Sequence, residues 1–481
     1  MTISGALSNA LSGLNAASRS AEIVASNIAN ATTEGYAARS LVLSSHSLGG
    51  VAVQGVQRSI EPSLLADRRL ADAAQGYQTE ITTTLKRMED LVGGPLEVGS
   101  LSIQTSAFEA ALIEAASRPE STERLDRAVE SAESLARKIR DISTGIQTIR
   151  TTADRRIADQ VSQLNNDLEE VRLLNKRIVS FTAQGLETAP LLDARQGLID
   201  RIATVVPVTE VPRDKGSIAL FTPGGAILLD ITAAKIGFTQ SNLVTPHMTQ
   251  SGGTLSGLTI NSIPISTDPD DGPLRGGRLA AAFEVRDKLT VTMQQQLDST
   301  ARDLIERLAE PGLDNTLTPG QPGLFTDAGL AFDPALETGL AQRIAVNPTI
   351  LSTQGGQSWR LRDGIGALQP GPSGEASLLH ALTDALASRR APASGSSTQE
   401  AYTFPELTTR VLSGIAATRQ FAEERQIYAT TRASALKQAE LERGVDTDDQ
   451  LQRLLKIEQA YAANARVIQT VGEMMDSLLR I

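Results

Sequence analysis

Apolar residues recur every three or four positions through a long central segment, and this pattern limits the possible folds more than any other feature. A continuous helix from Leu125 to Ile178 would be about 80 Å long at about 1.5 Å per residue. A periodic helix of more than about 25 residues is typical of a coiled coil or rod. The pattern therefore predicts an elongated helical stalk. The positions on this face are Leu125, Val129, Ala132, Ile139, Ile142, Ile146, Ile149, Ala153, Ile157, Val161, Leu164, Leu168, Val171, Leu174 and Ile178.

Both ends of the chain carry the same spacing, which is typical of a packed helix pair. The stripe near the start is rich in alanine, and the stripe near the end has one polar member, Asn464. We weigh two interpretations: the stripes bury against the protein's own core, or they are completed by other subunits. The stripes consist of Ile3, Leu7, Ala10, Leu14, Ala17, Ala21, Val24 and Ile28, and of Leu454, Ile457, Tyr461, Asn464, Ile468, Val471, Met475 and Leu478.

A change of period near Val205 marks a β-rich insertion. Segments 205–209, 218–221 and 227–229 resemble short strands, a turn at 223–225 joins the last two, and further strands are expected within 257–265. Helix is expected again over 279–308, and from Phe404 to the end with a break at Gly444. The predicted fold class is mainly α with a β insertion: paired N- and C-terminal helices of coiled-coil type, a long helical stalk domain and an outer β-rich domain.

Four units follow from these patterns. Residues 1–40 with 445–481 form a terminal helical axial-core domain. Residues 41–204 with 277–310 and 400–444 form the helical stalk domain. Residues 205–276 form the β-rich outer domain, and residues 311–399 form a Gly/Pro-rich irregular region packed on the stalk.

The composition excludes much of enzyme chemistry. The 481 residues include no cysteine and three separated histidines, His46, His247 and His380, and the formal net charge is −11. No phosphate loop, nucleophile elbow, zinc helix or dinucleotide fingerprint is present. We therefore expect no enzyme activity, no catalytic residue, no cofactor, no metal, and no nucleic-acid partner. No apolar run approaches the roughly 18 residues of a membrane span, so no membrane partner is expected. The N-terminus has no basic segment followed by an apolar one, so no Sec-type signal is expected.

Three acidic groups have simpler explanations than catalysis. The 268–272 segment resembles a calcium loop but lacks the EF-hand spacing, so we interpret it as a solvated turn. Asp446, Asp448 and Asp449 are expected to complement the positive end of the last helix. The group formed by Asp193, Arg195, Asp200 and Arg201 is interpreted as a solvated helix face.

A polar segment, 26–36, follows the first helical stripe. Asn27 and Asn30 belong to a run of short polar side chains that can end a helix by competing for backbone hydrogen bonds. Gly35 can adopt a positive φ, and Tyr36 offers an apolar body to anchor the exit. By itself this pattern indicates a helix end.

The segment also resembles the N-terminal signature of the bacterial flagellar rod, hook and hook-associated proteins, a run like Asn-Ile-Ala-Asn-x-x-Thr-x-Gly-Tyr. The last helix, with 458–468 and 474–479, is similar to the matching C-terminal signature. Segments 164–178, 191–200 and 276–287 resemble the hook-associated protein 1 (FlgK) family within this group. Glu34 stands where a proline is common, and 37–39 reads Ala-Ala-Arg where Ser-Arg is usual.

The resemblance implies a structural protein rather than an enzyme: a hook–filament junction adaptor required for filament assembly. It implies secretion by the flagellar type III system to the extracellular bacterial flagellum, and a tubular layer of identical subunits. The implied partners are the flagellar hook protein, the second hook–filament junction protein, other copies of the chain, and an export chaperone that binds the C-terminal helix. The expected assembly interface is Ile3, Leu7, Leu14, Val24, Asn27, Ile28, Asn30, Gly35, Tyr36, Leu454, Ile457, Tyr461, Ile468, Val471, Met475 and Leu478.

Three alternatives stay open from the sequence. One is an enzyme within residues 205–400, whose activity would have to arise without cysteine and with few histidines. The chain could be another axial protein, either the hook protein or the second junction protein, although hook and rod proteins are expected to be mostly β between their ends, unlike residues 125–178. It could also be a soluble coiled-coil scaffold, which would not need matching signatures at both termini.

Overall fold

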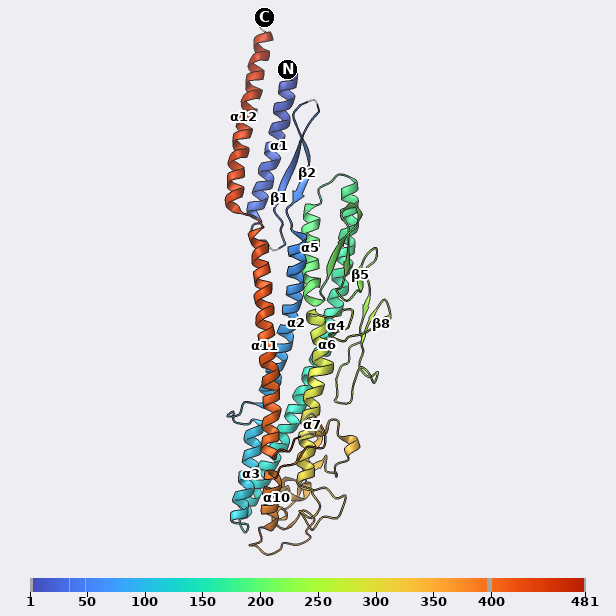
Figure 1. Ribbon diagram of the computed structural model, residues 1–481, viewed down its shortest axis with the longest axis vertical. Coiled ribbons are helices and arrows are strands. Elements are labelled where there is room, and N and C mark those ends of the chain that lie inside the picture. The colour runs from blue at the N-terminus through green and yellow to red at the C-terminus, as the bar shows by residue number, and fades with distance from the viewer. Residues whose placement is uncertain (1–2, 34, 48, 396–399, 480–481) are drawn as a thin grey trace.

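The computed structural model is an elongated rod, and both chain ends lie at the same end of it (Figure 1). It describes residues 3–33, 35–47, 49–395 and 400–479. The expected class, mainly α with small β elements, is confirmed. The helices are α1 (Ile3–Ala29), α2 (Pro62–Val92), α3 (Leu101–Ser117), α4 (Thr122–Ala183), α5 (Ala189–Val205), α6 (Gly277–Glu284), α7 (Thr290–Arg307), α8 (Leu340–Arg343), α9 (Arg360–Asp363), α10 (Ser377–Ala387), α11 (Phe404–Glu442) and α12 (Thr447–Leu479). The strands are β1 (Arg39–Ser45), β2 (Val51–Arg58), β3 (Thr209–Pro212), β4 (Ile218–Phe221), β5 (Ile227–Leu229), β6 (Ile236–Gly237), β7 (Leu258–Ile260), β8 (Ile263–Ile265), β9 (Phe325–Asp327) and β10 (Ile344–Val346).

The upper part of the rod, which we call the tip, consists of α1, α12 and the hairpin β1–β2 (Figure 1). α1 packs along α12, and the hairpin lies against α1. The hairpin strands are antiparallel, with a register shift after Val42. The sequence-based division places residues 41–58 in the helical stalk, whereas the structure forms most of this hairpin there, against α1. Branched side chains recur in β1 and β2, and Gly49 and Gly50 both adopt the positive φ of a tight turn, so this segment favours a hairpin over a helix.

The stalk is built on α4, a 62-residue helix that confirms the expected rod. α2, α3, α5, α6, α7 and α8 pack against it. The expected helix over 279–308 is also present, as α6 and α7 joined by a π-helical turn at Val285–Leu289. α11 ends at Glu442 and α12 begins at Thr447, which confirms the break expected at Gly444.

The β-rich part lies beside the upper half of α4 as two three-stranded antiparallel sheets, ordered β3-β4-β5 and β6-β7-β8. It has no separate core. Leu220 and Leu229 of the first sheet share one apolar cluster with Leu164 and Leu168 of α4 and with Phe283 of α6. The strands at 218–221, 227–229 and within 257–265 are confirmed. The strand expected at 205–209 is shifted: α5 continues to Val205, and β3 begins only at Thr209.

Residues 311–395 contain short helices and the β9–β10 pair, and they cover the lower end of the rod. Phe325 stacks edge-on against Phe108 of α3, with ring centroids 5.7 Å apart. Ile344 and Leu379 belong to the same cluster as Ile139 and Ile142 of α4. The four-unit division of the chain stays a prediction, and residues 396–399 of its irregular region lie outside the described residues.

Candidate functional site

The terminal helices meet through small residues. Ala10, Ala16 and Ala17 of α1 are buried, and Val471 is buried on α12. A Cβ atom at Gly13 would lie 2.8 Å from the side-chain amide of Asn464, so the glycine permits close helix approach at the one polar position of the α12 stripe. The expected pairing of the two terminal helices is therefore present within a single chain.

The pairing covers only part of the expected interface. Val24 and Val471 are buried, whereas Leu478 is 60% exposed. Ile3, Leu7, Leu14, Ile28, Ile457 and Ile468 are half-buried, and Leu454, Tyr461 and Met475 are exposed. Neighbouring α12 residues outside the predicted stripe are also exposed, namely Leu451, Leu455, Val467, Met474 and Leu479. The sequence analysis missed these because they do not follow a single three–four seam.

An apolar groove lies between the two helices near their open end. It has a volume of about 400 Å³ and is lined by Ile3 and Ala6 of α1 and by Val467, Val471 and Met474 of α12. Arg466 and Thr470 supply its polar rim. One chain alone therefore leaves apolar surface uncovered at the tip.

Asn27 holds together the three segments that meet at the base of the tip. Its side chain is completely buried. The Asn27 amide donates to the carbonyl of Arg39 at 2.8 Å and to Oε1 of Gln450, at the start of α12, at 2.9 Å. Its Oδ1 accepts from the Tyr36 hydroxyl at 2.9 Å and from the Arg39 backbone N–H at 3.0 Å. All four hydrogen-bonding positions of this amide are used, so Asn27 fixes α1, β1 and α12 relative to one another.

The remaining motif residues shape the turn that leads to this amide. The Asn30 side chain donates to the carbonyl of Ser26 at 2.9 Å, and Gly35 has a φ of 78°. The Arg39 guanidinium lies 4.8 Å from the centre of the Tyr36 ring, within cation–π distance. Arg39 thus contacts the turn at Tyr36 even though Ala-Ala-Arg replaces the usual Ser-Arg. Glu34, at the proline position, lies outside the described residues.

Asp193 joins the hairpin to the stalk. Its carboxylate pairs with Arg39 from the start of β1 and with Arg58 from the end of β2, the latter at 2.6 Å. Arg58 also donates to Oε1 of Gln196 at 2.9 Å, one turn further along α5. Burial lowers the pKa of Arg58, and the adjacent Asp193 carboxylate offsets part of that effect. These ion pairs are sheltered from solvent, so each charge depends on its partner.

Two turns beyond Asp193 on α5, Asp200 forms ion pairs with two arginines from α2. Arg68 and Arg69 each approach its Oδ1, at 2.7 and 2.6 Å. Arg68 also binds Glu440 near the end of α11 at 2.6 Å, and Arg69 binds Glu210 of β3. We call the set Arg39, Arg58, Arg68, Arg69, Asp193, Asp200, Glu210 and Glu440 the joint network.

The joint network corrects the expectation of a solvated face on α5. Arg195 is also buried, where it donates to Asn175 Oδ1 and to the Gly216 carbonyl, both at 2.8 Å. Burial, with the nearby Arg58 and Arg69, lowers the pKa of Arg195 to about 10, so it is still charged at neutral pH. Among the four residues only Arg201 is half-exposed, at 53% of its side chain. A sequence pattern of mixed charges cannot distinguish a solvated face from one covered by opposite charges on distant segments.

The other acidic groups behave as expected. Asp446 caps α12 by accepting from the backbone N–H groups of Asp448 and Asp449 at 2.9 and 3.2 Å. Asp268 accepts from the Asp270 N–H within its own turn and pairs with Lys288 at 3.2 Å.

Within the described residues, no group of three or more His, Asp or Glu side chains is placed to hold a metal ion. Nor is any described helix long and apolar enough to cross a membrane.

Three family models match the chain. Residues 85–322 match the helical domain of flagellar hook-associated protein FlgK. Residues 7–36 match the flagellar basal body rod protein model, and residues 442–481 match the C-terminal model of the rod FlgEFG proteins. The chain belongs to the FlgK family. The two terminal models cover most of α1 with the turn that follows it, and α12, the elements that meet at Asn27. The FlgK model covers α3 to α7 and the β-rich part.

Curated relatives carry the same family name. Flagellar hook-associated protein 1 of Escherichia coli is 23% identical, with all of both chains covered, and that of Bacillus subtilis is 21% identical over 98% of this chain and 97% of its own. The protein of the same name from Salmonella typhimurium is 26% identical over 58% of this chain. That alignment spans about half, 55%, of the Salmonella protein's own length.

A solved structure of the flagellar hook junction protein FlgK from Burkholderia pseudomallei is also similar. It is 17% identical and covers 56% of this chain and 47% of its own, with a TM-score of 0.45. A similarity of that size carries no argument about how the parts of this chain are arranged.

Proposed function

We propose that this chain is a structural adaptor of the bacterial flagellum that forms one layer of the junction between hook and filament. The observation that carries the proposal is the incompletely covered pair α1–α12. Both helices begin or end at the same end of the rod, are joined at Asn27, and still expose apolar residues such as Leu454, Met475 and Leu478. Identical subunits arranged around an axis would bury these residues against one another.

On this proposal the tip lines the tube and the stalk extends away from it. The joint network holds the two at a fixed angle, since Asp193 and Asp200 of α5 receive arginines from the hairpin and from α2. The subunit would contact the hook protein on one side of the layer and the second hook–filament junction protein on the other. It would reach this place by type III export, and a chain without cysteine suits export in an unfolded form.

We also propose that an export chaperone covers α12 in the cytoplasm. The exposed residues Leu451, Leu455, Met474 and Met475 would otherwise favour aggregation. Methionine side chains adapt to a binding groove, which favours such transient contacts before assembly.

The test is the location and effect of the chain in cells that produce it. Deletion of the gene should leave hooks without filaments and release filament protein into the medium. Complementation should restore filaments, and a labelled subunit should lie in one layer at the distal end of isolated hooks. A labelled subunit distributed along the hook or rod would contradict the proposal. It would favour another axial protein, the alternative that the rod-type terminal matches support.

A further inference from the structure

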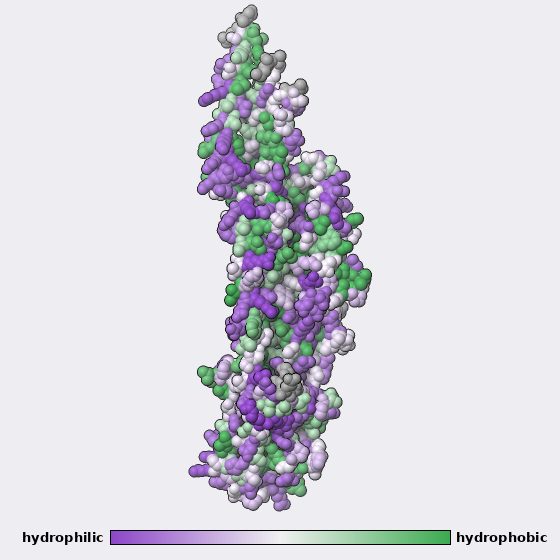
Figure 2. Space-filling model, in the orientation of Figure 1, coloured by the Kyte–Doolittle hydropathy of each residue, from purple (hydrophilic) through white to green (hydrophobic). Residues whose placement is uncertain are grey.

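A loop between α2 and α3 carries two almost fully exposed aliphatic side chains. Leu96 is 94% exposed and Val98 is 95% exposed. The loop is held by its own hydrogen bonds, because the Glu97 carboxylate accepts from the Gly94 N–H at 2.9 Å and the Glu97 carbonyl accepts from the Ser100 N–H at 3.0 Å. It projects from the left side of the rod above α3 in Figure 1, and Figure 2 shows a hydrophobic knob there. We call Leu96, Glu97 and Val98 the knob.

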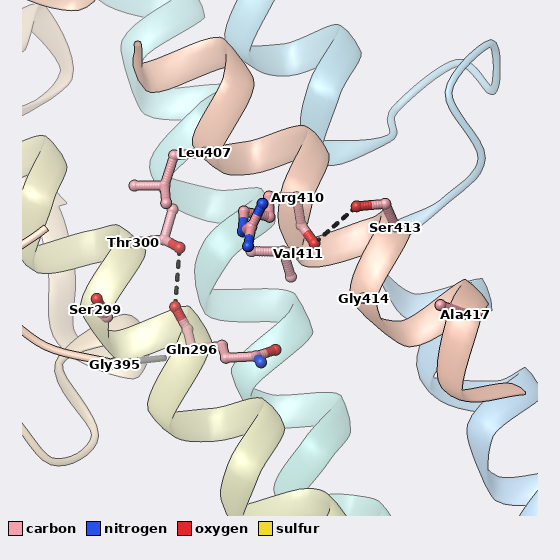
Figure 3. Close-up of a pocket in the computed structure, with 10 residues that line it drawn as sticks. All are labelled: Gln296, Ser299, Thr300, Gly395, Leu407, Arg410, Val411, Ser413, Gly414 and Ala417. Carbon is pink, nitrogen blue, oxygen red and sulfur yellow. Dashed lines mark hydrogen bonds between the residues drawn. The ribbon is translucent and has the colours of Figure 1, made fainter. Parts of the chain in front are cut away.

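A groove lies on another side of the rod, between α7 and α11. Its volume is about 470 Å³, and its apolar lining comes from Leu407, Val411 and Ala417 of α11 (Figure 3). Two hydroxyls on its walls are already engaged with their own helices. Thr300 donates to the Gln296 carbonyl at 2.9 Å, and Ser413 donates to the Arg410 carbonyl at 3.1 Å. We call this space the α7–α11 groove.

Gly414 lines the α7–α11 groove at a helix position where alanine would make the helix more stable. A glycine inside a helix costs about 1 kcal/mol relative to alanine. A Cβ atom at Gly414 would meet no other atom within 4 Å, so packing within the chain does not require the glycine. Close approach of a second molecule would require it.

The knob and the groove lie at nearly the same height on the rod. Arg419 of α11 pairs with Glu89 of α2, which sets the two helices in register. The loop begins at Gly93, about 6 Å further down α2, and Gly414 lies about 8 Å further down α11, at 1.5 Å per residue. The loop projects to the left of α11 in Figure 1, whereas α7, which forms the other wall of the groove, lies to the right of α11.

We propose that the knob of one copy inserts into the α7–α11 groove of a second copy of this chain. The two surfaces differ and lie at one height, which is the geometry of a head-to-tail contact that closes into a ring. The charges agree: Glu97 on the knob would face Arg410 on the groove wall, a half-exposed side chain whose ion pair with the exposed Glu400 is long, at 3.8 Å. This contact specifies how neighbours join sideways, and it rests on the proposed tubular layer.

Cysteine cross-linking tests the contact directly, because the natural chain has no cysteine. The variant Leu96→Cys/Ala417→Cys should give a ladder of disulfide-linked multimers when isolated hook ends are oxidised. Each single variant should give none. Leu368→Cys/Ala417→Cys is the matched control, since Leu368 is a 91% exposed leucine in a different loop. A double variant that reaches the hook end, retains filaments and cross-links no more than this control would overturn the inference.

A blocking variant keeps the test decisive if the cysteine variant fails to assemble. Gly414→Leu should leave the purified chain folded, with an unchanged melting temperature, and should reduce filament retention about tenfold or more, equivalent to about 1.4 kcal/mol at the contact. Gln420→Leu, on the same helix outside the groove, should have no effect. Normal filament retention in Gly414→Leu cells would overturn the inference. Absence of the natural chain from hook ends would instead overturn the proposed function.

Discussion

Two helices with the same spacing of apolar residues, α4 in the stalk and α12 in the tip, have very different surroundings. In α4 the positions Ile139, Leu164 and Leu168 are completely buried by other segments of the chain. In α12 only Val471 among the stripe residues is buried, and Leu478 is 60% exposed. The spacing therefore shows that a helix has a face to bury, but not whether the covering surface belongs to the same molecule. This contrast separates the part of the protein that folds alone from the part that we propose is completed by assembly.

The largest expected effect on the isolated chain is at the centre of the stalk. Leu168→Asp places a charge where no solvent reaches, which should cost at least about 4–5 kcal/mol of unfolding free energy. Thermal unfolding followed by circular dichroism should show loss of most of the helical signal at growth temperature. Glu169→Gln, at the adjacent exposed position, is the control. A stable Leu168→Asp protein would mean that α4 is not the core of the stalk.

A second effect comes from a buried carboxyl in α7. Burial raises the pKa of Asp298 to about 6, although the backbone N–H groups of Gly339 and Ala341 donate to it at 2.8 Å. The folded chain then binds this proton more strongly than the unfolded chain, so its unfolding free energy falls as the pH rises through about 4 to 6. The change amounts to about 3 kcal/mol, at about 1.4 kcal/mol per pKa unit.

Denaturant unfolding of the natural chain and of Asp298→Asn at pH 4, 5, 6 and 7 measures this pH-dependent part of the unfolding free energy. The stability of the natural chain relative to the variant should decrease as the pH rises and level off above pH 6. A constant difference between the two proteins would show that Asp298 ionises normally in the fold.

Removal of Asp193 should loosen the tip without unfolding the stalk. Asp193→Ala leaves Arg39 and Arg58 without their shared carboxylate, at a local cost of about 2–4 kcal/mol. Hydrogen exchange should accelerate in β1, β2 and the turn at 30–38, and remain slow in α4. Glu187→Gln is the control, because Glu187 is exposed and 4.0 Å from Arg39, an arrangement that contributes little. Equal acceleration along the whole chain would show that the joint network is not the boundary between tip and stalk.

The substitution with the smallest expected effect on the stability of the isolated chain is one that should prevent assembly. Ile468→Asp changes a half-buried position of α12, so the melting temperature of the purified protein should change little. In an assembled layer the same charge would be buried, which costs several kcal/mol in each copy. Chaperone binding should weaken, swimming should stop and filament protein should appear in the medium. Gln452→Asp, at an exposed position, should be tolerated. Normal swimming with retained filaments in Ile468→Asp cells would contradict a buried axial role for α12.

The site was only partly predictable from sequence. The motif that contains Asn27, Asn30, Gly35 and Tyr36 was identified, and the structure assigns it a definite task, because the buried Asn27 amide binds Tyr36, Arg39 and Gln450. The joint network was missed. Asp193 and its arginine partners are separated by more than 130 residues, and no local pattern reports which distant charges will meet.

The sequence by itself determined the long helices with regularly spaced apolar residues, and where these helices end. The stripe over 125–178 fixed α4, and the polar break near Gly444 separated α11 from α12, because helix periodicity and end signals are local properties of the chain. Only the tertiary structure decided what covers each face. It paired α1 with α12 through alanines and Gly13, buried the charged face of α5 under arginines from α2 and the hairpin, and left the α12 face open. Burial depends on contacts between segments far apart in sequence, and the apolar spacing is the same whether those contacts come from within the chain or from its neighbours.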